Sequence, residues 1–580
     1  MQQGKNNPNK FNDEQNSDRL NYLDSWLLLG WFAVSMILRF TNLANQPASS
    51  IEIATLGFSL GHSFAQVPLE QVISASTLLS PLQVDFSINS TDVVHRLLTE
   101  STHPPLYFWL THWWIELFCH DGELVSLQVG RSLSAVFGGL AIPAIFGMSW
   151  LAWRDRLTAH LSAVLMTFSP YGIYLAQEAR HYTLSILWII ASLCCLIVAI
   201  EQINRRRKMR WSIVLTWIGI NSLGIATHYF FALALVIEFL IVLGFWFGQR
   251  DRSKQLSFDH WLPLINVGCG TLVGCLVWLP VISGISSNEL TEWIETSYSL
   301  NEIWQPLPRM TAWLISMIVL LPIEGVPIAI AICSGIIILL ALIWVIPTII
   351  QRWKLSLNNP RSLSIRLLTG YLFGTVILYL LLIYGYGKDI SLAARYHFVY
   401  FPVIILVLSA ILAKLWHTPT EKEEVSDRQW FYSKGKQVVA VVLLMSLLGS
   451  LTVINDLGFK KSKHSDLMAE HIQEVSTVPT IVATTYETLS QLRELIALAL
   501  SLQTSSLSDV APTSQFLLMR RNEYHNFNLN EILAPQPKPL DLWGINLKSS
   551  EDALIKINCT KDNESKLSNS GYTNHLYHCY

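Results

Sequence analysis

Charged side chains are scarce in this 580-residue chain, where Asp, Glu, Lys and Arg together make up 14% of the residues. Soluble domains carry about 25% charge, so the deficit excludes a chain that is mostly solvated by water. The net charge of −2 also lacks the basic excess that nucleic-acid binding requires, and we expect no nucleic-acid partner. Hydrophobic residues make up 51% of the chain, and the mean hydropathy is +0.37. Most of the chain is therefore predicted to lie in a lipid bilayer.

Three further patterns are missing from the sequence. The eight Cys residues show no metal-ligand spacing. The first apolar run has no small-residue cleavage site after it and is interpreted as a retained span, not a signal peptide. Inverted repeats, which are typical of many secondary transporters, are not visible. The transporter hypothesis is therefore disfavoured, and uptake by proteoliposomes is its direct test.

Long apolar runs dominate what is present. A span needs about 20 apolar residues, because every backbone N–H and C=O must be paired inside the segment. The predicted fold is an α-helical polytopic membrane protein with roughly 11–13 spans. The candidate spans are 25–43, 105–118, 127–151, 157–175, 183–203, 211–229, 231–248, 260–282, 326–350, 367–385, 398–416 and 438–456. The run 305–323 is broken by three Pro residues and is interpreted as interfacial or re-entrant.

Basic connectors indicate the orientation, because Lys and Arg favour the cytoplasmic side. The chain has four such connectors. Placing all of them on the cytoplasmic side makes the later spans alternate and leaves 283–310, 386–397 and everything after 456 outside. The early region then contains one crossing too many before Arg205, so either 105–118 or 157–175 is broken or miscounted. The four connectors are 205–208, 249–254, 352–366 and 414–436.

Composition divides the chain into three parts. Residues 1–24 are predicted to form a cytoplasmic polar tail, and 25–456 a transmembrane domain whose first outer loop is 44–104. The remainder, 457–580, is predicted to be a small extracytoplasmic α/β domain. Its Cys559 and Cys579 can pair if that region is oxidised. The expected elements are strands at 480–484, 515–519 and 540–547 and a helix at 487–502.

Two glutamates and a histidine lie in the predicted first outer loop, close to where the chain meets the membrane. Ionisable groups there are costly, so each is a functional candidate. Glu52 is interpreted either as a catalytic base or as a solvated loop acid. Glu100 and His103 precede Pro104-Pro105, which biases His103 toward an extended conformation. The pair suggests a catalytic carboxylate beside a candidate metal ligand, His103, and the competing interpretation is a Pro-stiffened helix start.

Polar insertions between apolar runs supply further candidates. Glu178, Arg180 and His181 lie in the first, and Arg180 suits bidentate contact with a phosphate. The alternative for Arg180 is an ion pair with Glu178. The second insertion contains His228 and Tyr229, interpreted as substrate contacts or, for the histidine, as a hydrogen-bonded packing residue.

A third polar insertion contains Lys388, Arg395 and Tyr396 in a short predicted outer loop. Its cations suit an anionic headgroup, and the alternative is membrane anchoring by a basic rim. Together the candidates are two separated carboxylates, several cations and several His. A carboxylate can remove a proton from an incoming hydroxyl or amine, while cations stabilise the charge on a departing phosphate. This chemistry fits transfer of a group from a lipid-linked phosphate.

The combined order of these motifs resembles the GT-C class of membrane glycosyltransferases. The nearest branch is the bacterial, cyanobacterial-like group related to protein O-mannosyltransferases and lipid A aminoarabinose transferase, and the resemblance covers most of 25–416. The motifs are Glu100-Ser101-Thr102-His103-Pro104-Pro105-Leu106-Tyr107, Gly130-Arg131-Ser132-Leu133-Ser134-Ala135, Ser169-Pro170, Tyr174 to Tyr182, Thr227-His228-Tyr229 and Ala394-Arg395-Tyr396 before Pro402.

The resemblance implies an inverting transferase that takes a sugar from a polyprenyl-phosphate donor at the outer face of the inner (plasma) membrane. The acceptor is a hydroxyl or amine on an unidentified protein, lipid or glycan. No certain cofactor is implied, and a divalent metal stays open. Arg131 matches the family arginine at the head of the third span, which implies contact with the donor; an ordinary helix-end arginine is the alternative.

One position departs from the family pattern. The first outer loop of the family opens with an acidic pair, Asp-Glu, and the Asp is the expected catalytic acid. This sequence has Ile51-Glu52 at the corresponding place. Three expectations follow: Glu52 takes over, Glu100 takes over, or the chain binds lipid-linked sugar without transferring it.

Overall fold

The computed structural model describes residues 20–250, 258–283, 298, 302–358, 363–417, 428–505, 513–520, 529–548, 558–562 and 564–580. Most of the predicted polar tail and part of the connector 249–254 lie outside these residues. The chain divides into two compact units. The helical unit is Met1–Thr41, Ser134–Ser286 and Thr291–Phe459, and the α/β unit is Asn42–Leu133, Ser287–Leu290 and Lys460–Tyr580.

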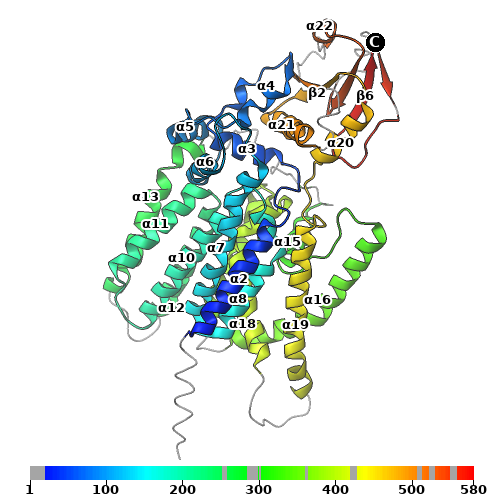
Figure 1. Ribbon diagram of the computed structural model, residues 1–580. Helices are drawn as coiled ribbons and strands as arrows, with labels where there is room; N and C mark the ends of the chain where they lie inside the picture. The colour runs from blue at the N-terminus through cyan, green and yellow to red at the C-terminus, as the bar shows by residue number, and fades with distance from the viewer. Residues whose placement is uncertain are drawn as a thin grey trace, which may run out of the picture. The chain divides into compact units, whose positions relative to one another are not determined.

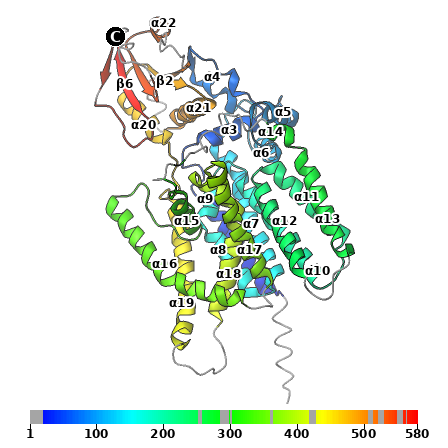
Figure 2. The same cartoon turned by 180° about the vertical axis from the view of Figure 1, so that it is seen from behind.

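Long apolar helices build the helical unit, and they lie side by side in both views (Figures 1 and 2). Within the described residues, seven are long and apolar enough to cross a membrane. They are α2 (Tyr22–Phe40), α7 (Leu127–Trp153), α10 (Tyr182–Asn204), α12 (Phe231–Arg250), α16 (Ile328–Leu357), α17 (Leu363–Tyr386) and α19 (Arg428–Ile454). Three shorter apolar helices accompany them, α11 (Trp211–Thr227), α13 (Leu262–Leu276) and α18 (Phe401–Trp416). The polytopic helical fold predicted from the sequence is confirmed.

The predicted span 157–175 is broken in two, into α8 (Arg156–Phe168) and α9 (Pro170–Ala176). Ser169 adopts an extended conformation between them, and Pro170 starts the new helix because it lacks the N–H that continuation requires. The Ser169 hydroxyl accepts from the N–H of Gly172 at 3.0 Å and donates to the carbonyl of Met317 at 2.7 Å. These two bonds fix the place where the chain turns before the polar insertion at 177–181.

The predicted span 105–118 is wrong. This segment forms α6 (Leu106–Phe118), whose 13 residues extend about 20 Å, short of the roughly 30 Å hydrocarbon core. It also belongs to the α/β unit. If the broken pair α8–α9 is counted as one crossing and α6 as none, α2, α7, α8–α9 and α10 give four crossings before Arg205. The surplus crossing of the sequence analysis is therefore this helix.

Arg39 is a buried cation in the last turn of α2, with 1% of its surface exposed. Its guanidinium donates to the Ser35 hydroxyl at 2.6 Å and to the carbonyl of Met166, in the last turn of α8, at 3.0 Å. A cation is favourable there because the final carbonyls of a helix lack partners and carry partial negative charge. Gly138 makes the space, since a Cβ on it would approach Arg39 Nε to 2.9 Å. Arg39 thus joins α2 to α8.

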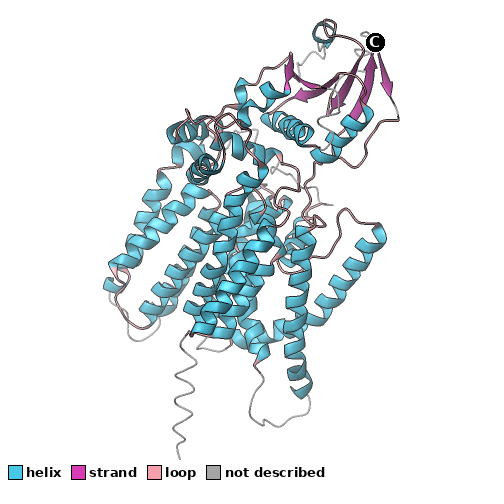
Figure 3. Ribbon diagram, viewed as in Figure 1, coloured by secondary structure: helices cyan, strands magenta, loops and turns pink. Residues whose placement is uncertain are grey.

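A six-stranded sheet forms the core of the α/β unit, in the order β1-β3-β2-β4-β6-β5 (Figure 3). The strands are β1 (Val72–Ser74), β2 (Thr480–Tyr486), β3 (Ser514–Arg520), β4 (Leu540–Ile545), β5 (Cys559–Asp562) and β6 (Asn574–Cys579). Strands β3, β2 and β4 are parallel neighbours, whereas β1, β6 and β5 pair antiparallel. Helices α20 (Ser465–Val475) and α21 (Leu489–Thr504) pack against each other, and α21 also packs against β2. The three strands and the helix predicted here are confirmed.

The first loop contributes to this sheet, which the sequence analysis did not predict. Val72 and Ser74 pair with Leu517 and Gln515 of β3, so a strand from the loop forms one edge of the sheet. Arg493 of α21 also lies over the ring of Phe64, 4.8 Å from its centroid. The loop therefore forms one unit with residues 460–580, where the prediction assigned it to the transmembrane domain. Its helices are α3 (Ser50–Ser59), α4 (Ala75–Leu79) and α5 (Ser90–Glu100), with short 3₁₀ turns η1 (Phe64–Gln66) and η2 (Ser80–Leu82).

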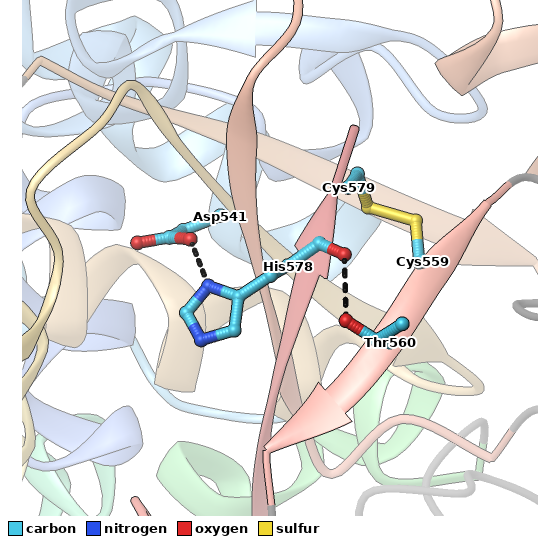
Figure 4. The surroundings of a disulfide bond; sticks show 5 residues. All are labelled: Asp541, Cys559, Thr560, His578 and Cys579. Carbon is cyan, nitrogen blue, oxygen red and sulfur yellow. Dashed lines mark hydrogen bonds and ion pairs between the residues drawn. A yellow bond between two sulfur atoms is a disulfide. The ribbon is translucent and has the colours of Figure 1, made fainter.

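A disulfide joins Cys559 and Cys579, a pairing that the sequence allowed but left open (Figure 4). The two residues are direct partners in the ladder of β5 and β6. Next to it, His578 Nδ1 lies 2.7 Å from the Asp541 carboxylate of β4. The covalent link therefore secures the edge of the sheet opposite β1.

Candidate active site

Glu52 lies in the first turn of α3 and is fully buried. Its carboxylate accepts from the backbone N–H of Ser49 at 3.1 Å, completing a capping box at the start of the helix. Arg131 binds the same carboxylate through two nitrogens, Nε to Oε1 at 2.8 Å and Nη2 to Oε2 at 3.1 Å. Lys461 Nζ lies 3.3 Å from Oε2. Two cations and a helix start therefore hold Glu52.

Arg131 uses all five guanidinium N–H groups within the α/β unit. Besides the two bonds to Glu52, Nη1 donates to the carbonyls of Leu43 at 3.0 Å and Gln46 at 2.8 Å, and Nη2 donates to Pro47 at 3.1 Å. The side chain is 1% exposed. This geometry favours a role in holding the loop before α3 over the predicted contact with a donor phosphate.

Glu100, at the last residue of α5, is in a more open setting. Its Oε1 pairs with Arg96 one turn earlier at 2.9 Å, and its Oε2 accepts from the Ser63 hydroxyl at 2.8 Å. The side chain is 21% exposed, compared with none for Glu52. Of the two predicted catalytic carboxylates, Glu100 is therefore the one that solvent or an acceptor can reach.

His103 was predicted as a candidate metal ligand near Glu100. Its Nδ1 lies 3.2 Å from the Ser101 hydroxyl, and its ring lies 5.8 Å from that of Phe108. Among the described residues, no group of three or more His, Cys, Asp or Glu side chains is arranged to hold a metal. The geometry therefore supports packing at the start of α6 for His103, and we assign no metal site.

The polar insertion after α9 is buried in the helical unit. Glu178, Arg180 and His181 are each at most 4% exposed. The Ser134 hydroxyl of α7 donates to the carbonyl of Arg180 at 2.8 Å, and the Arg180 N–H reaches back to Glu178 O at 2.7 Å. These bonds shape a tight turn that ends at His181, just before α10 begins. The Arg180 guanidinium lies over the Tyr182 ring, 5.6 Å from its centroid.

His228 follows α11 and lies against this turn. Its ring is 4.3 Å from that of His181, and its Nδ1 accepts from the N–H of Phe230 at 3.0 Å. Burial, reinforced by the positive charges of Arg180 and Arg395, lowers the pKa of His228 to about 3. His228 is therefore neutral at physiological pH, in a positive field. The neighbouring Tyr229 hydroxyl is buried without a hydrogen-bond partner among the described residues.

Arg395 and Tyr396 complete the cluster from the 3₁₀ turn η7 (Ala394–Val399). The Tyr171 hydroxyl donates to the carbonyl of Ala394 at 2.9 Å, and that of Tyr379 donates to Tyr396 at 2.7 Å, which fixes the backbone of the turn. The Arg395 guanidinium lies 5.3 Å from the centroid of the Tyr396 ring. We name Arg180, His181, His228, Arg395 and Tyr396 the cation cluster.

Lys388 lies at the start of the same loop, directly before Asp389. Asp389 is fully buried, pairs with Arg309 at 3.0 Å and accepts from the Ser391 hydroxyl at 2.6 Å. Tyr298 also donates to Asp389. This network is not visible in the sequence, because Arg309 and Tyr298 precede Asp389 by 80 and 91 residues.

Glu238 was also missed. It is a buried carboxylate inside α12, 4% exposed, that accepts from the Ser192 hydroxyl of α10 at 2.7 Å. Trp217 of α11 donates to the same Ser192 oxygen at 2.9 Å. A single acid within an apolar run was the available signal. Its contacts join three helices, which indicates a structural role.

Comparisons with known proteins agree with this fold. Residues 121–273 match the family described as dolichyl-phosphate-mannose-protein mannosyltransferase. The structure of ArnT from Cupriavidus metallidurans bound to undecaprenyl phosphate aligns over 96% of this chain and 98% of that chain, with a TM-score of 0.51 and 12% identity. The apo form of the same ArnT gives a TM-score of 0.50 and 11% identity with the same coverage.

The chain has the GT-C fold. The resemblance to the branch of aminoarabinose transferase and protein mannosyltransferase, predicted from the motifs, is thereby confirmed. The archaeal oligosaccharyltransferase AglB from Archaeoglobus fulgidus, in complex with an inhibitory peptide and a dolichol-phosphate, aligns at a TM-score of 0.43 and 9% identity over 82% of this chain and 64% of that chain. The GT-C assignment rests on ArnT and the matched family.

Proposed function

We propose that this GT-C protein transfers a sugar from a polyprenyl-phosphate donor to a hydroxyl or amine acceptor, with inversion at the sugar carbon. The observation that carries the proposal is the cation cluster of the helical unit. Two arginines act together on His228, and both His228 and Arg180 are at least 90% buried. Two cations beside one buried point suit the binding of an anion, and the phosphate of a lipid-linked donor is such an anion.

In the proposed reaction the two arginines and the carboxylate have separate roles. Arg180 and Arg395 bind the donor phosphate and stabilise the negative charge that develops when the bond to the sugar breaks. The hydrogen-bond donors proposed around the phosphate are His181, His228, Tyr229 and Tyr396. A carboxylate removes the acceptor proton, and the acceptor oxygen or nitrogen attacks the sugar carbon while the bond from that carbon to the phosphate oxygen breaks.

Glu100 is the carboxylate we propose for proton removal. Its side chain is 21% exposed and accepts from a hydroxyl, Ser63, which is the geometry that an acceptor hydroxyl would adopt. Glu52 is fully buried and bound by Arg131 and Lys461, so we propose that it positions the loop that begins α3. Ile51 stands at the start of α3, where the catalytic acid was expected. In this proposal the base of the reaction is therefore Glu100 on α5.

The order of crossings supports an outer-face orientation. Four crossings before Arg205 return the chain to the side on which it started, so the N-terminal tail and the basic run 205–208 share one side. Because basic connectors favour the cytoplasm, that side is proposed to be cytoplasmic. The turns that carry His228 and Arg395 then face outward, in a multi-pass protein of the plasma membrane.

Transfer of a radiolabelled sugar from a purified polyprenyl-phosphate donor tests the proposal. We expect turnover by the wild type, and a loss of 100-fold or more in Glu100→Gln, which keeps the size of the side chain but cannot take the proton. Asp92→Asn, a substitution at the start of the same helix α5, is the matched control and retains activity. Wild-type rates in Glu100→Gln would contradict the role of Glu100.

A second candidate function is binding of lipid-linked sugar without transfer. It is favoured by Ile51 at the position of the expected catalytic Asp and by the fully paired state of Glu52. It predicts donor binding that depends on Arg180 and Arg395 but no turnover with any acceptor. Detectable turnover by the wild-type protein would remove this candidate.

A further inference from the structure

We propose that a basic pocket at one end of the helical unit binds the phosphate headgroup of an anionic membrane lipid. The pocket is distinct from the cation cluster and has a volume of about 660 Å³. It is formed where α7 and α10 end and α17 begins, all three of which are candidate membrane spans. Its position is therefore the level at which lipid headgroups meet a membrane protein.

The polar part of the lining is strongly basic. Three arginines, Arg154, Arg205 and Arg207, line the pocket, and a single carboxylate, Glu201, accompanies them. Glu201 lies 2.6 Å from Arg205 and neutralises that one charge. The remaining charge of two arginines favours an anion, and planar guanidinium groups match phosphate oxygens in pairs.

The apolar part of the lining distinguishes a lipid from a soluble phosphate. It includes the side chains of Leu151, Ala152, Ile197, Val198, Leu363 and Leu367. A free phosphate has no apolar surface to bury against these side chains. The glycerol backbone and the first acyl carbons of a phospholipid do have such surface. Basic pockets between membrane helices are a known way of binding anionic headgroups.

Contacts within the chain fix the walls of the pocket. The Ser364 hydroxyl at the start of α17 donates to the carbonyl of Ala152 near the end of α7, at 2.8 Å, which joins two of the three walls. Arg154 adopts a left-handed backbone conformation, with φ of 54°, directly after α7. Arg205 caps the end of α10, its N–H donating to the carbonyl of Glu201 at 2.9 Å. These contacts fix the backbone positions from which the three arginines line the pocket.

Native mass spectrometry of the purified full-length protein tests the inference. The protein in a phosphatidylcholine environment is titrated with phosphatidylglycerol, and the retained lipid is counted. We expect one tightly held phosphatidylglycerol on the wild type. Each of Arg154→Gln and Arg207→Gln should weaken it about fivefold, and the triple variant with Arg205→Gln on the order of 100-fold, from about 1 kcal/mol per basic residue near a membrane surface.

The same charged segment supplies the matched control. Arg206→Gln with Arg210→Gln removes two charges from residues that do not line the pocket, and we expect wild-type retention. Equal weakening in control and pocket variants would overturn the proposal, because it would show general attraction to basic residues. Retention of phosphatidylcholine as strong as that of phosphatidylglycerol would also overturn it. Displacement of phosphatidylglycerol by equimolar glycerol 3-phosphate would overturn the lipid assignment in favour of a soluble phosphate.

Discussion

Replacing Arg131 by Met tests whether this residue holds the loop before α3 or contacts the donor. The change removes two hydrogen bonds to the buried Glu52 and three to the carbonyls of Leu43, Gln46 and Pro47. Breaking a buried ion pair costs about 3–5 kcal/mol. Lys461 still lies 3.3 Å from Glu52, so we expect the lower end, about 3 kcal/mol.

The loss is local, so the assay is hydrogen–deuterium exchange of the backbone N–H groups in 43–55. A drop of about 3 kcal/mol in the free energy of local opening speeds exchange on the order of 100-fold. The double variant Arg131→Met with Glu52→Gln should lose less than the sum of the two single variants, because no unpaired carboxylate is left buried. Unchanged exchange together with a raised KM for the donor would refute the positioning role and restore the predicted phosphate contact.

Three other predictions concern stability. In unfolded chains His is protonated near pH 6.5, whereas buried His228 stays neutral down to about pH 3. Between these pH values the unfolded state binds more protons than the folded state, so the stability of the folded state falls as the pH drops. The apparent Tm of His228→Gln should therefore fall less than that of the wild type between pH 7 and 4.5, and parallel pH profiles would contradict this. The double variant Cys559→Ser with Cys579→Ser removes the disulfide, which closes a loop of 20 residues. The free energy of unfolding of this part of the sheet should fall by about 3 kcal/mol, seen as faster hydrogen exchange in β5 and β6 with no change in α10. Arg39→Met leaves the carbonyl of Met166 without its donor and should cost about 1–3 kcal/mol in thermal unfolding, while Arg210→Met should leave the Tm unchanged.

Local patterns made most of the helical unit predictable. Apolar runs identified the spans because the bilayer demands internal pairing of every backbone group. The error at 105–118 came from composition, since Trp and Phe made a 13-residue helix look like a short span. The break at Ser169-Pro170 was visible as a sequence, but its effect on the crossing count required the structure.

The candidate site was predictable in its residue types and less so in its partners. Arg180, His181, His228 and Arg395 were singled out, and the charges of both arginines contribute to the lowered pKa of His228. The pairing of Glu52 with Arg131 was not predicted, because 79 residues separate them and no local pattern records such a contact. For the same reason β1 was missed: three residues give too short a signal, and its pairing with β3 is formed across more than 400 residues of chain.

Binding of polyprenyl phosphate to the cation cluster is the most direct test of the account. Affinity is measured for the wild type, Arg180→Gln, Arg395→Gln, their double variant and the control Arg210→Gln, in a neutral detergent. We predict that each cluster substitution weakens binding about tenfold or more, from the loss of a hydrogen bond to a charged group, and that the control binds as the wild type does. Wild-type affinity in the double variant would contradict the assignment of the cation cluster as the donor phosphate site.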